Sequence, residues 1–135
     1  MNELSVDATI ENLDKIVDFV DTNLDSFDCP IKSKIEIDIA LDEIFSNIVH
    51  YAYEGKVGKA TIRIGQSEDK KEIIIQFIDS GVPYNPLLKE DPNVNLSAEE
   101  RKVGGLGIYI VKKSMDKVEY EHKNNQNILT IKKVI

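Results

Sequence analysis

The chain has 135 residues, 41% of them hydrophobic and 30% charged, which suits one globular domain and is short for two. Its formal net charge of −7 gives no reason to expect long-range attraction to nucleic acid. No apolar run approaches the ~20 residues that cross a bilayer, and the first residues lack a signal-peptide pattern. The lone Cys29 excludes an internal disulfide. We therefore expect a cytoplasmic protein with no membrane or nucleic-acid partner.

The first half of the chain is predicted to contain three strands and two helices. Apolar–polar alternation predicts a short strand over residues 4–8, and helical spacing of apolar residues predicts a helix over residues 9–26. The same spacing predicts a second helix over about residues 31–53. Two strands follow over residues 60–64 and 72–79, joined by a polar turn.

The second half contains a long stretch rich in proline and asparagine. A loop as long as residues 82–103 inside a compact domain indicates a functional lid. A capping box at residues 97–100 predicts a short helix within it. A third helix is expected over residues 104–114, and a hairpin of strands 117–123 and 127–134 completes the chain.

The order of these elements defines the expected fold class. Strands followed by helices and then by a hairpin predict an α+β fold. We expect a two-layer sandwich in which a mostly antiparallel mixed sheet carries helices on one face. Residues 1–135 are expected to form a single domain, because no linker or internal repeat interrupts them.

The second predicted helix carries an acid and an amide one turn apart. Glu43 and Asn47 share one side of that helix because residues four apart lie on the same face. An amide oxygen is a suitable ligand for Mg²⁺, and a carboxylate one turn earlier can accept a proton from an attacking hydroxyl or water. The alternative is a Glu/Asn pair that simply faces solvent.

Asp79 and Gly81 follow the most apolar predicted strand. A carboxylate at this strand end can accept a hydrogen bond from the exocyclic amine of adenine, which guanine lacks at that edge. A buried donor or acceptor left without a hydrogen-bond partner costs about 1–3 kcal/mol, so a carboxylate at this position would select adenine over guanine. Gly81 would let the flat base approach the backbone. The alternative is that Asp79 only forms a turn.

A cluster of glycines opens the third predicted helix. The backbone N–H groups of Gly104-Gly105-Leu106-Gly107 can close around phosphate oxygens, and the start of the helix adds favourable partial charge. Arg101 and Lys102 lie just upstream and can neutralise a terminal phosphate. The spacing matches neither a Walker loop nor a dinucleotide-binding loop. The alternative is a flexible loop followed by an ordinary helix start.

Together these segments resemble the three sequence boxes of the GHKL ATPase superfamily, which includes gyrase, histidine kinases and MutL. The matching segments are residues 42–53 (DEIFSNIVHYAY), 79–86 (DSGVPYNP) and 104–116 (GGLGIYIVKKSMD). Within the superfamily, the serine/threonine kinase branch of anti-sigma factors is the most similar in length and in these details. The resemblance covers nearly the whole chain.

The resemblance implies a Bergerat fold that binds ATP and Mg²⁺ beneath a mobile lid at about 82–103. Glu43 would be the catalytic general base, and Asn47 would be the metal ligand. The other residues implied to contact the nucleotide are Asp79, Gly81, Gly104, Gly105, Leu106 and Gly107. The basic lid residue that reaches the terminal phosphate is either Arg101 or Lys102.

The implied function is an ATP- and Mg²⁺-dependent serine/threonine protein kinase that acts as an anti-sigma factor in a partner-switching module. Its substrate would be a small antagonist protein, a sigma factor would be a second partner, and the branch commonly forms homodimers. The alternatives are a non-catalytic ATP-binding module that sequesters a regulator, and a weak ATPase. Residues 1–50 contain 12 acids and 3 bases. This acidic segment is either a solvated helical face or a docking surface for a basic partner.

Overall fold

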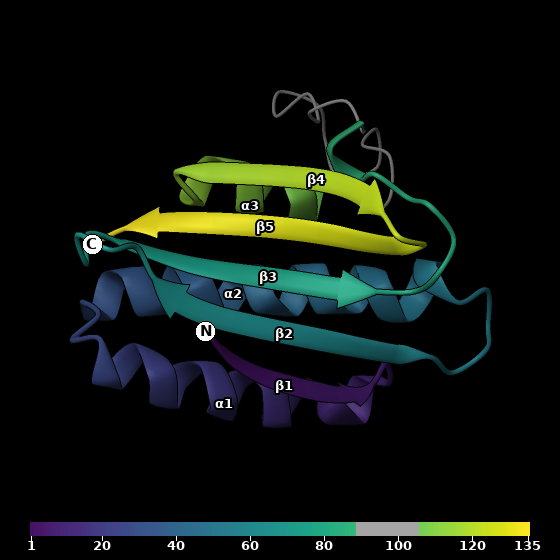
Figure 1. Ribbon diagram of the computed structural model, residues 1–135, viewed down its shortest axis with the longest axis horizontal. Coiled ribbons are helices and arrows are strands. Elements are labelled where there is room, and N and C mark those ends of the chain that lie inside the picture. Colours follow the sequence, from purple (N-terminus) through teal and green to yellow (C-terminus); the bar gives the residue numbers. More distant parts are fainter. Residues whose placement is uncertain (89–105) are drawn as a thin grey trace.

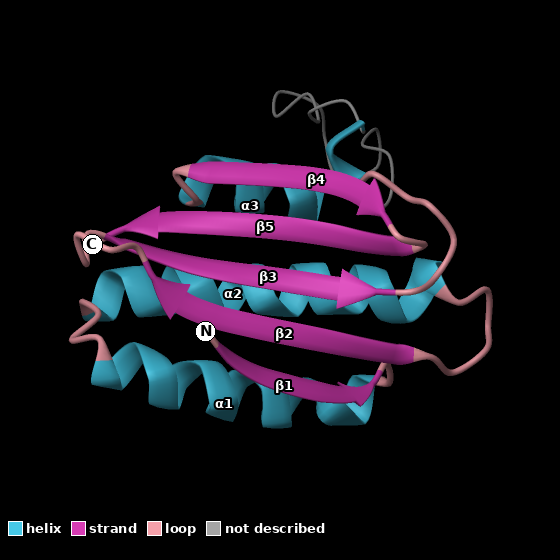
Figure 2. Ribbon diagram, in the orientation of Figure 1, coloured by secondary structure: helices cyan, strands magenta, loops and turns pink. Residues whose placement is uncertain are grey.

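The computed structural model describes residues 1–88 and 106–135, apart from the side chain of Leu106. Five strands form one layer, and three helices cover one face of that layer (Figures 1 and 2). The strands are β1 (Asn2–Asp7), β2 (Lys59–Gln66), β3 (Glu72–Asp79), β4 (Lys117–Lys123) and β5 (Gln126–Val134). The helices are α1 (Leu13–Ser26), α2 (Ile31–Asn47) and α3 (Leu106–Ser114), with short turns η1 (Ile10–Asn12), η2 (Ile48–Ala52) and η3 (Pro86–Leu88).

The sheet has the strand order β1-β2-β3-β5-β4. Every pairing between neighbouring strands in the described part of the chain is antiparallel. The predicted α+β sandwich with helices on one face is therefore confirmed. The described sheet contains no parallel pair, although the sequence-based expectation was a mixed sheet that was mostly antiparallel.

Alternation along the strands produces the helix-facing side of the sheet. Because successive strand residues point to opposite faces, one face collects the apolar side chains. The buried residues of β2, β3 and β5 on this pattern are Ala60, Ile62, Ile64, Ile73, Ile75, Phe77, Leu129 and Ile131. Burying each large side chain of this kind contributes about 1.5–3 kcal/mol relative to leaving it exposed.

The helices supply the other half of the core through one apolar stripe each. Ile16, Val20 and Leu24 of α1 are fully buried, as the predicted helical spacing requires. Ile37 and Leu41 of α2 are likewise fully buried. The predicted faces of both helices are confirmed, while the segment predicted as helix 9–26 starts with the turn η1 before α1.

The segment predicted as one helix over residues 31–53 is divided in two. Helix α2 ends at Asn47, and residues 48–52 form a single π-helical turn, η2. Such turns are rare and occur frequently at functional sites. A wider turn here changes the direction of the side chains that follow Asn47.

Tyr53 fixes the end of η2 to the sheet. Its hydroxyl accepts a hydrogen bond from the Ser80 backbone N–H at 2.9 Å and donates one to the Lys59 carbonyl. Burial, and then the nearby Asp79 carboxylate, raises the pKa of Tyr53, so the hydroxyl keeps the proton that it donates. Tyr53 therefore ties the chain after η2 to the start of β2 and the end of β3.

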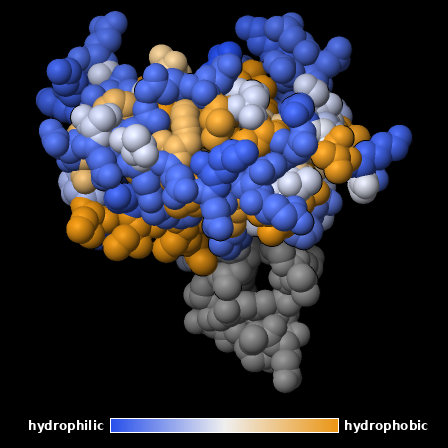
Figure 3. All heavy atoms as spheres, turned by 90° about the horizontal axis from the view of Figure 1, so that it is seen from below, coloured by the Kyte–Doolittle hydropathy of each residue, from blue (hydrophilic) through white to orange (hydrophobic). Residues whose placement is uncertain are grey.

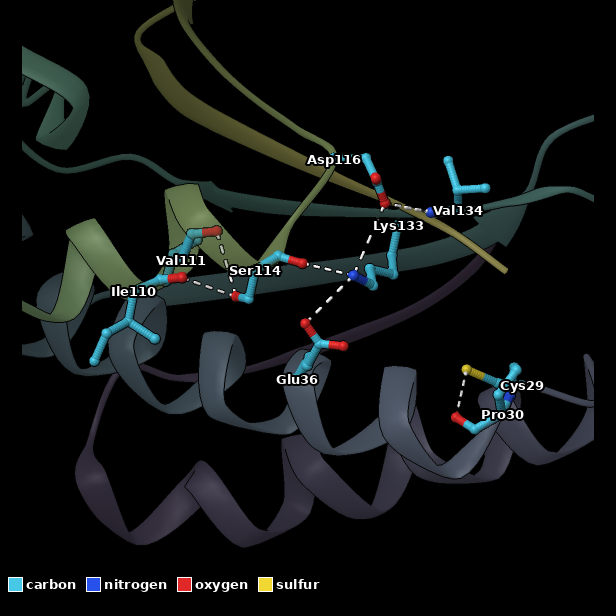
Figure 4. A network of polar contacts seen from close by, with 9 residues as sticks. All are labelled: Cys29, Pro30, Glu36, Ile110, Val111, Ser114, Asp116, Lys133 and Val134. Carbon is cyan, nitrogen blue, oxygen red and sulfur yellow. Dashed lines mark hydrogen bonds and ion pairs between the residues drawn. The ribbon is translucent and has the colours of Figure 1, made fainter.

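Lys133 of β5 fixes the C-terminal end of α3 (Figure 4). Its ammonium donates to the Ser114 carbonyl at 2.7 Å and forms ion pairs with Glu36 at 3.4 Å and Asp116 at 4.0 Å. A cation at this end of a helix satisfies carbonyl groups that lack an intrahelical partner. One lysine thus joins α3, α2 and β5.

Two acids face each other between α1 and α2. The Oδ1 atoms of Asp21 and Asp38 are buried and have no hydrogen-bond partner among the described residues when both carboxylates are ionised. Burial, followed by the hydrogen bond and negative charge of Asp21, raises the pKa of Asp38 to about 7. A proton on Asp38 supplies the donor that this pair otherwise lacks.

The raised pKa of Asp38 predicts a pH-dependent stability. Between about pH 4 and pH 7 the folded state binds a proton that the unfolded state has lost, so stability falls as pH rises through this window. We expect Asp38→Asn to stabilise the protein at pH 8 by about 1 kcal/mol, a value already discounted for solvent screening, and to have no such effect at pH 4. Urea denaturation of both proteins at pH 4 and at pH 8 measures this change in the free energy of unfolding. A gain of equal size in Asp14→Asn, which removes an exposed acid on α1 two turns before Asp21, would contradict this origin.

Candidate functional site

A pocket lies between the C-terminal part of α2 and the adjacent ends of β3 and β5. Its empty volume is about 420 Å³, including part open to solvent. The residues that line it are Ile44, Asn47, Ile48, Ala52, Phe77, Asp79, Tyr84, Pro86, Tyr120, Asn127 and Leu129. A largely apolar pocket with a few convergent polar groups is the usual form of a small-molecule site.

Asp79 is the acid in this pocket. It ends β3 and is only 6% exposed. Its Oδ1 atom accepts hydrogen bonds from Asn127 Nδ2 and from the Gly81 backbone N–H, both at 2.9 Å. Within residues 1–88 and 106–135, the Oδ2 atom has no hydrogen-bond donor. One carboxylate oxygen is therefore held by the protein while the other remains able to accept a hydrogen bond from a ligand.

Asn127 is a residue of this pocket that sequence reasoning missed. It pairs with Asp79 across β3 and β5, and its Nδ2 also donates to the Val82 carbonyl at 2.9 Å. Its Oδ1 accepts from the Tyr84 backbone N–H at 3.3 Å and from the Tyr120 hydroxyl. This one buried amide thus orients the Asp79 carboxylate and the chain that follows β3.

The signal for Asn127 is present in the sequence as a polar residue at a core position. Period-two alternation in β5 places Asn127 on the same face as the buried Leu129 and Ile131. A buried amide requires hydrogen-bond partners. The partner is Asp79, which is 48 residues away in sequence. Predicting this pair requires the register between β3 and β5.

Gly81 allows the turn after β3 to pack on η2. A Cβ atom at this position would lie 2.1 Å from the Ala52 carbonyl oxygen and 2.6 Å from the Ala52 Cβ atom. The next residue, Val82, donates its backbone N–H to the same Ala52 oxygen at 2.8 Å. The immediate neighbour of Gly81 is therefore the backbone of η2, and Gly81 supports the wall of the pocket.

Replacing Gly81 with alanine is expected to lower the stability of the protein. The added methyl group meets backbone atoms of Ala52 that cannot rotate away, and overpacking of this kind costs about 1–3 kcal/mol. Urea denaturation measures the loss of stability. Gly65→Ala is the matched control, because its methyl group would meet mainly the flexible Met1 side chain. Equal stability of the two variants would contradict the close packing of Gly81.

Glu43, Asn47 and Gly107 come together where α2 meets α3. Asn47 lines the pocket, and Glu43 lies one turn earlier on the same helix. The Glu43 Oε2 atom lies 1.9 Å from the place that a Cβ atom on Gly107 would occupy. A glycine in the first turn of α3 therefore leaves the space that the Glu43 carboxylate fills.

Two aromatic residues complete the surroundings of the pocket. Tyr84 lines it, and its ring stacks on Tyr51 of η2 with centroids 5.6 Å apart. His50 is exposed, and its Nδ1 atom lies 2.8 Å from the Ser46 carbonyl of its own helical segment. His50 is not among the residues that line the pocket.

The structure brings Asn47, Asp79, Gly81 and Gly107 to the same region, with Glu43 beside Gly107. The remaining predicted site residues are Arg101, Lys102, Gly104, Gly105 and the side chain of Leu106. These lie outside the described residues, as do residues 89–103 of the predicted lid.

The chain matches the family model of the histidine kinase-like ATPase domain over residues 6–133. It belongs to this family, and the predicted relationship to the GHKL superfamily is confirmed. None of the described helices is both long and apolar enough to cross a membrane.

Named relatives agree with the predicted branch. Serine-protein kinase RsbW of Bacillus mycoides (strain KBAB4) is 34% identical over 101 residues, which cover 72% of this chain and 62% of that protein. The proteins of the same name from Bacillus cereus strains ATCC 10987 / NRS 248 and B4264 are 34% and 35% identical, with the same coverage. The match therefore spans less than two thirds of these relatives.

Proposed function

We propose that this chain is an ATP- and Mg²⁺-dependent serine/threonine protein kinase that acts as an anti-sigma factor in a partner-switching module. The observation that carries the proposal is the meeting of Asp79 and Asn47 in one pocket, with Glu43 one turn from Asn47 and against α3. The serine-protein kinase name of the relatives supports the same class.

The adenine base is assigned to the apolar part of the pocket. Asp79 Oδ2 would accept a hydrogen bond from the exocyclic amine, because Oδ1 is already held by Asn127 and the Gly81 N–H. A carbonyl in place of the amine, as in guanine, would face this carboxylate with no proton to share. Ile44, Phe77 and Leu129 would contact the faces and edges of the ring.

The donor set at the phosphate end fits Mg²⁺. Among the described residues, no group of three or more His, Cys, Asp or Glu side chains forms a metal cage. A single amide oxygen from Asn47 suits Mg²⁺, which is typically bound by one or two protein ligands together with substrate phosphates and water. When bound, the ion would supply charge neutralisation on the phosphates.

Glu43 is assigned as the general base. The hydroxyl oxygen of an acceptor Ser or Thr would form a bond to the γ-phosphorus, its proton would pass to the Glu43 carboxylate, and ADP would leave. Gly105 and Gly107 would contact phosphate oxygens through the backbone, and Arg101 or Lys102 would reach the terminal phosphate from a lid at about 82–103. The acceptor would be a small antagonist protein, with a sigma factor as the second partner.

The test uses γ-labelled ATP with Mg²⁺, with and without the purified antagonist. Label on a Ser or Thr of the antagonist is the expected result. Free phosphate without labelled protein would instead indicate an ATPase, and ATP binding without either product would indicate a sequestering module. Either of these results would contradict the kinase assignment.

A further inference from the structure

Helix α2 exposes a row of isoleucines on the side opposite its core face. Ile31, Ile35 and Ile39 are four residues apart and are 76%, 55% and 46% exposed. Residues at this spacing lie on one side of a helix, so the three side chains form a continuous stripe. Figure 3 shows hydrophobic groups gathered at the lower left of the molecule, in a view otherwise rich in hydrophilic residues.

These isoleucines are not part of the core cluster of buried side chains or of the residues packed against it. β-branched residues are weaker helix formers than the leucine, lysine or glutamate that an exposed helix position usually favours. The core face of α2 is already supplied by residues such as Ile37, Leu41 and Ile44, which are at most 2% exposed. A contiguous exposed apolar surface of this kind indicates an interaction site.

A row of acids on α1 lies along one side of this stripe. Its members recur at spacings of four, three and four, so they share one side of α1: Asp14, Asp18, Asp21 and Asp25. Lys34 of α2 bonds to Asp25 at 3.0 Å, and Asp21 faces Asp38 of α2. These two contacts place the acidic row directly beside the flank of α2.

The charge of the acidic row selects the kind of occupant. In a symmetric contact in which the two α2 helices run antiparallel, each stripe would meet the other stripe and the acidic rows would approach each other. Like charges brought together at an interface are unfavourable, whereas a basic partner would be attracted and aligned. The acidic row therefore favours a partner of opposite charge over an antiparallel contact with a second copy of this chain.

We propose that the stripe of Ile31, Ile35 and Ile39, with the acidic row on α1, is a docking surface for a partner protein. The segment that docks is an amphipathic helix with a basic row along one edge of its apolar face. Its apolar residues contact the isoleucines, and its Lys or Arg residues lie over Asp14 and Asp18. This surface does not involve the nucleotide pocket, so the proposal does not depend on the proposed kinase activity.

The test uses a designed helical peptide as the probe. Its apolar face carries leucines at helical spacing, and one edge carries a row of lysines; a scrambled peptide of the same composition lacks the apolar face. Fluorescence anisotropy with the full chain, without nucleotide, measures binding. We expect the designed peptide to bind and the scrambled peptide to bind at least 10-fold more weakly. We expect the double variant Ile35→Gln/Ile39→Gln to weaken binding of the designed peptide at least 10-fold.

The matched control is Val57→Gln/Val134→Gln, which removes two exposed apolar residues elsewhere and should leave binding unchanged. Asp14→Asn/Asp18→Asn should weaken binding and reduce its dependence on salt. The proposal is overturned if no peptide binds, if the scrambled peptide binds as well, or if the isoleucine variant binds as well as the control. Sedimentation showing a dimer that Ile35→Gln/Ile39→Gln dissociates would assign the surface to a second copy and would also overturn it.

Discussion

Glu43→Ala is expected to reduce phosphoryl transfer at least ~100-fold while leaving ATP affinity nearly unchanged, because a positioned general base contributes about 10²–10⁴ in rate. Glu43 does not line the pocket assigned above to adenine, so its removal should leave the proposed adenine contacts intact. The conservative variant Glu43→Gln fills the space beside Gly107 but cannot accept the proton, so it should be equally inactive. Label transfer from ATP and calorimetric ATP binding measure the two quantities.

Asp42→Ala is the control for this experiment. Asp42 is the neighbouring acid on α2, is exposed, and accepts a hydrogen bond from the Ser46 hydroxyl at 3.2 Å. Its removal should leave transfer unchanged. If Glu43→Ala and Glu43→Gln phosphorylate the antagonist as fast as Asp42→Ala does, the base must be another group.

Asp79→Asn is expected to weaken ATP binding by roughly 10–100-fold, corresponding to about 1–3 kcal/mol for an unmatched buried polar group. The new amide can still accept the hydrogen bonds from Asn127 and Gly81 through its oxygen. Its NH₂ group then faces the pocket, where it opposes the amine of adenine. Since a donor suits the carbonyl of guanine, the ratio of ATP to GTP affinity should fall as well.

Calorimetric titration of this variant with ATP and with GTP checks both statements. Asp42→Asn serves as the control, because it makes the same substitution at an exposed position on α2. The midpoint of thermal unfolding of Asp79→Asn should match that of the native protein, which shows that the substitution has not unfolded the site. Unchanged ATP affinity in a folded Asp79→Asn protein would remove Asp79 from base recognition.

The regular elements could be predicted from sequence because local patterns determine them. Apolar spacing located α1 and the first part of α2, and alternation, an apolar run and turn residues between strands located all five strands. The hairpin turn at Asn124 and Asn125 was also recognisable, since both residues adopt positive φ angles of 54° and 60° that asparagine tolerates. These features depend on residues close together in the chain.

The details of the site depend on contacts between distant segments, so sequence patterns could not predict them. The switch from α-helix to the π-helical turn η2 occurs within an uninterrupted helical pattern. The crowding of Gly81 against Ala52, and the pairing of Asn127 with Asp79, join segments 29 and 48 residues apart. The three boxes were found through their residue types, whereas the side chains that support them require the tertiary structure.

The attachment of α3 through Lys133 restricts how that helix can move. The carbonyl of its last residue, Ser114, accepts a hydrogen bond from the Lys133 ammonium, which is also paired with Glu36. The Lys133 side chain lies on β5 and is only 15% exposed. Sliding the whole helix along its axis would break these bonds, whereas a small swing about Ser114 would preserve them. Such a swing moves Gly107 most, at the opposite end, so a rearrangement of α3 would change the spacing between Gly107 and Glu43 while leaving the far end in place.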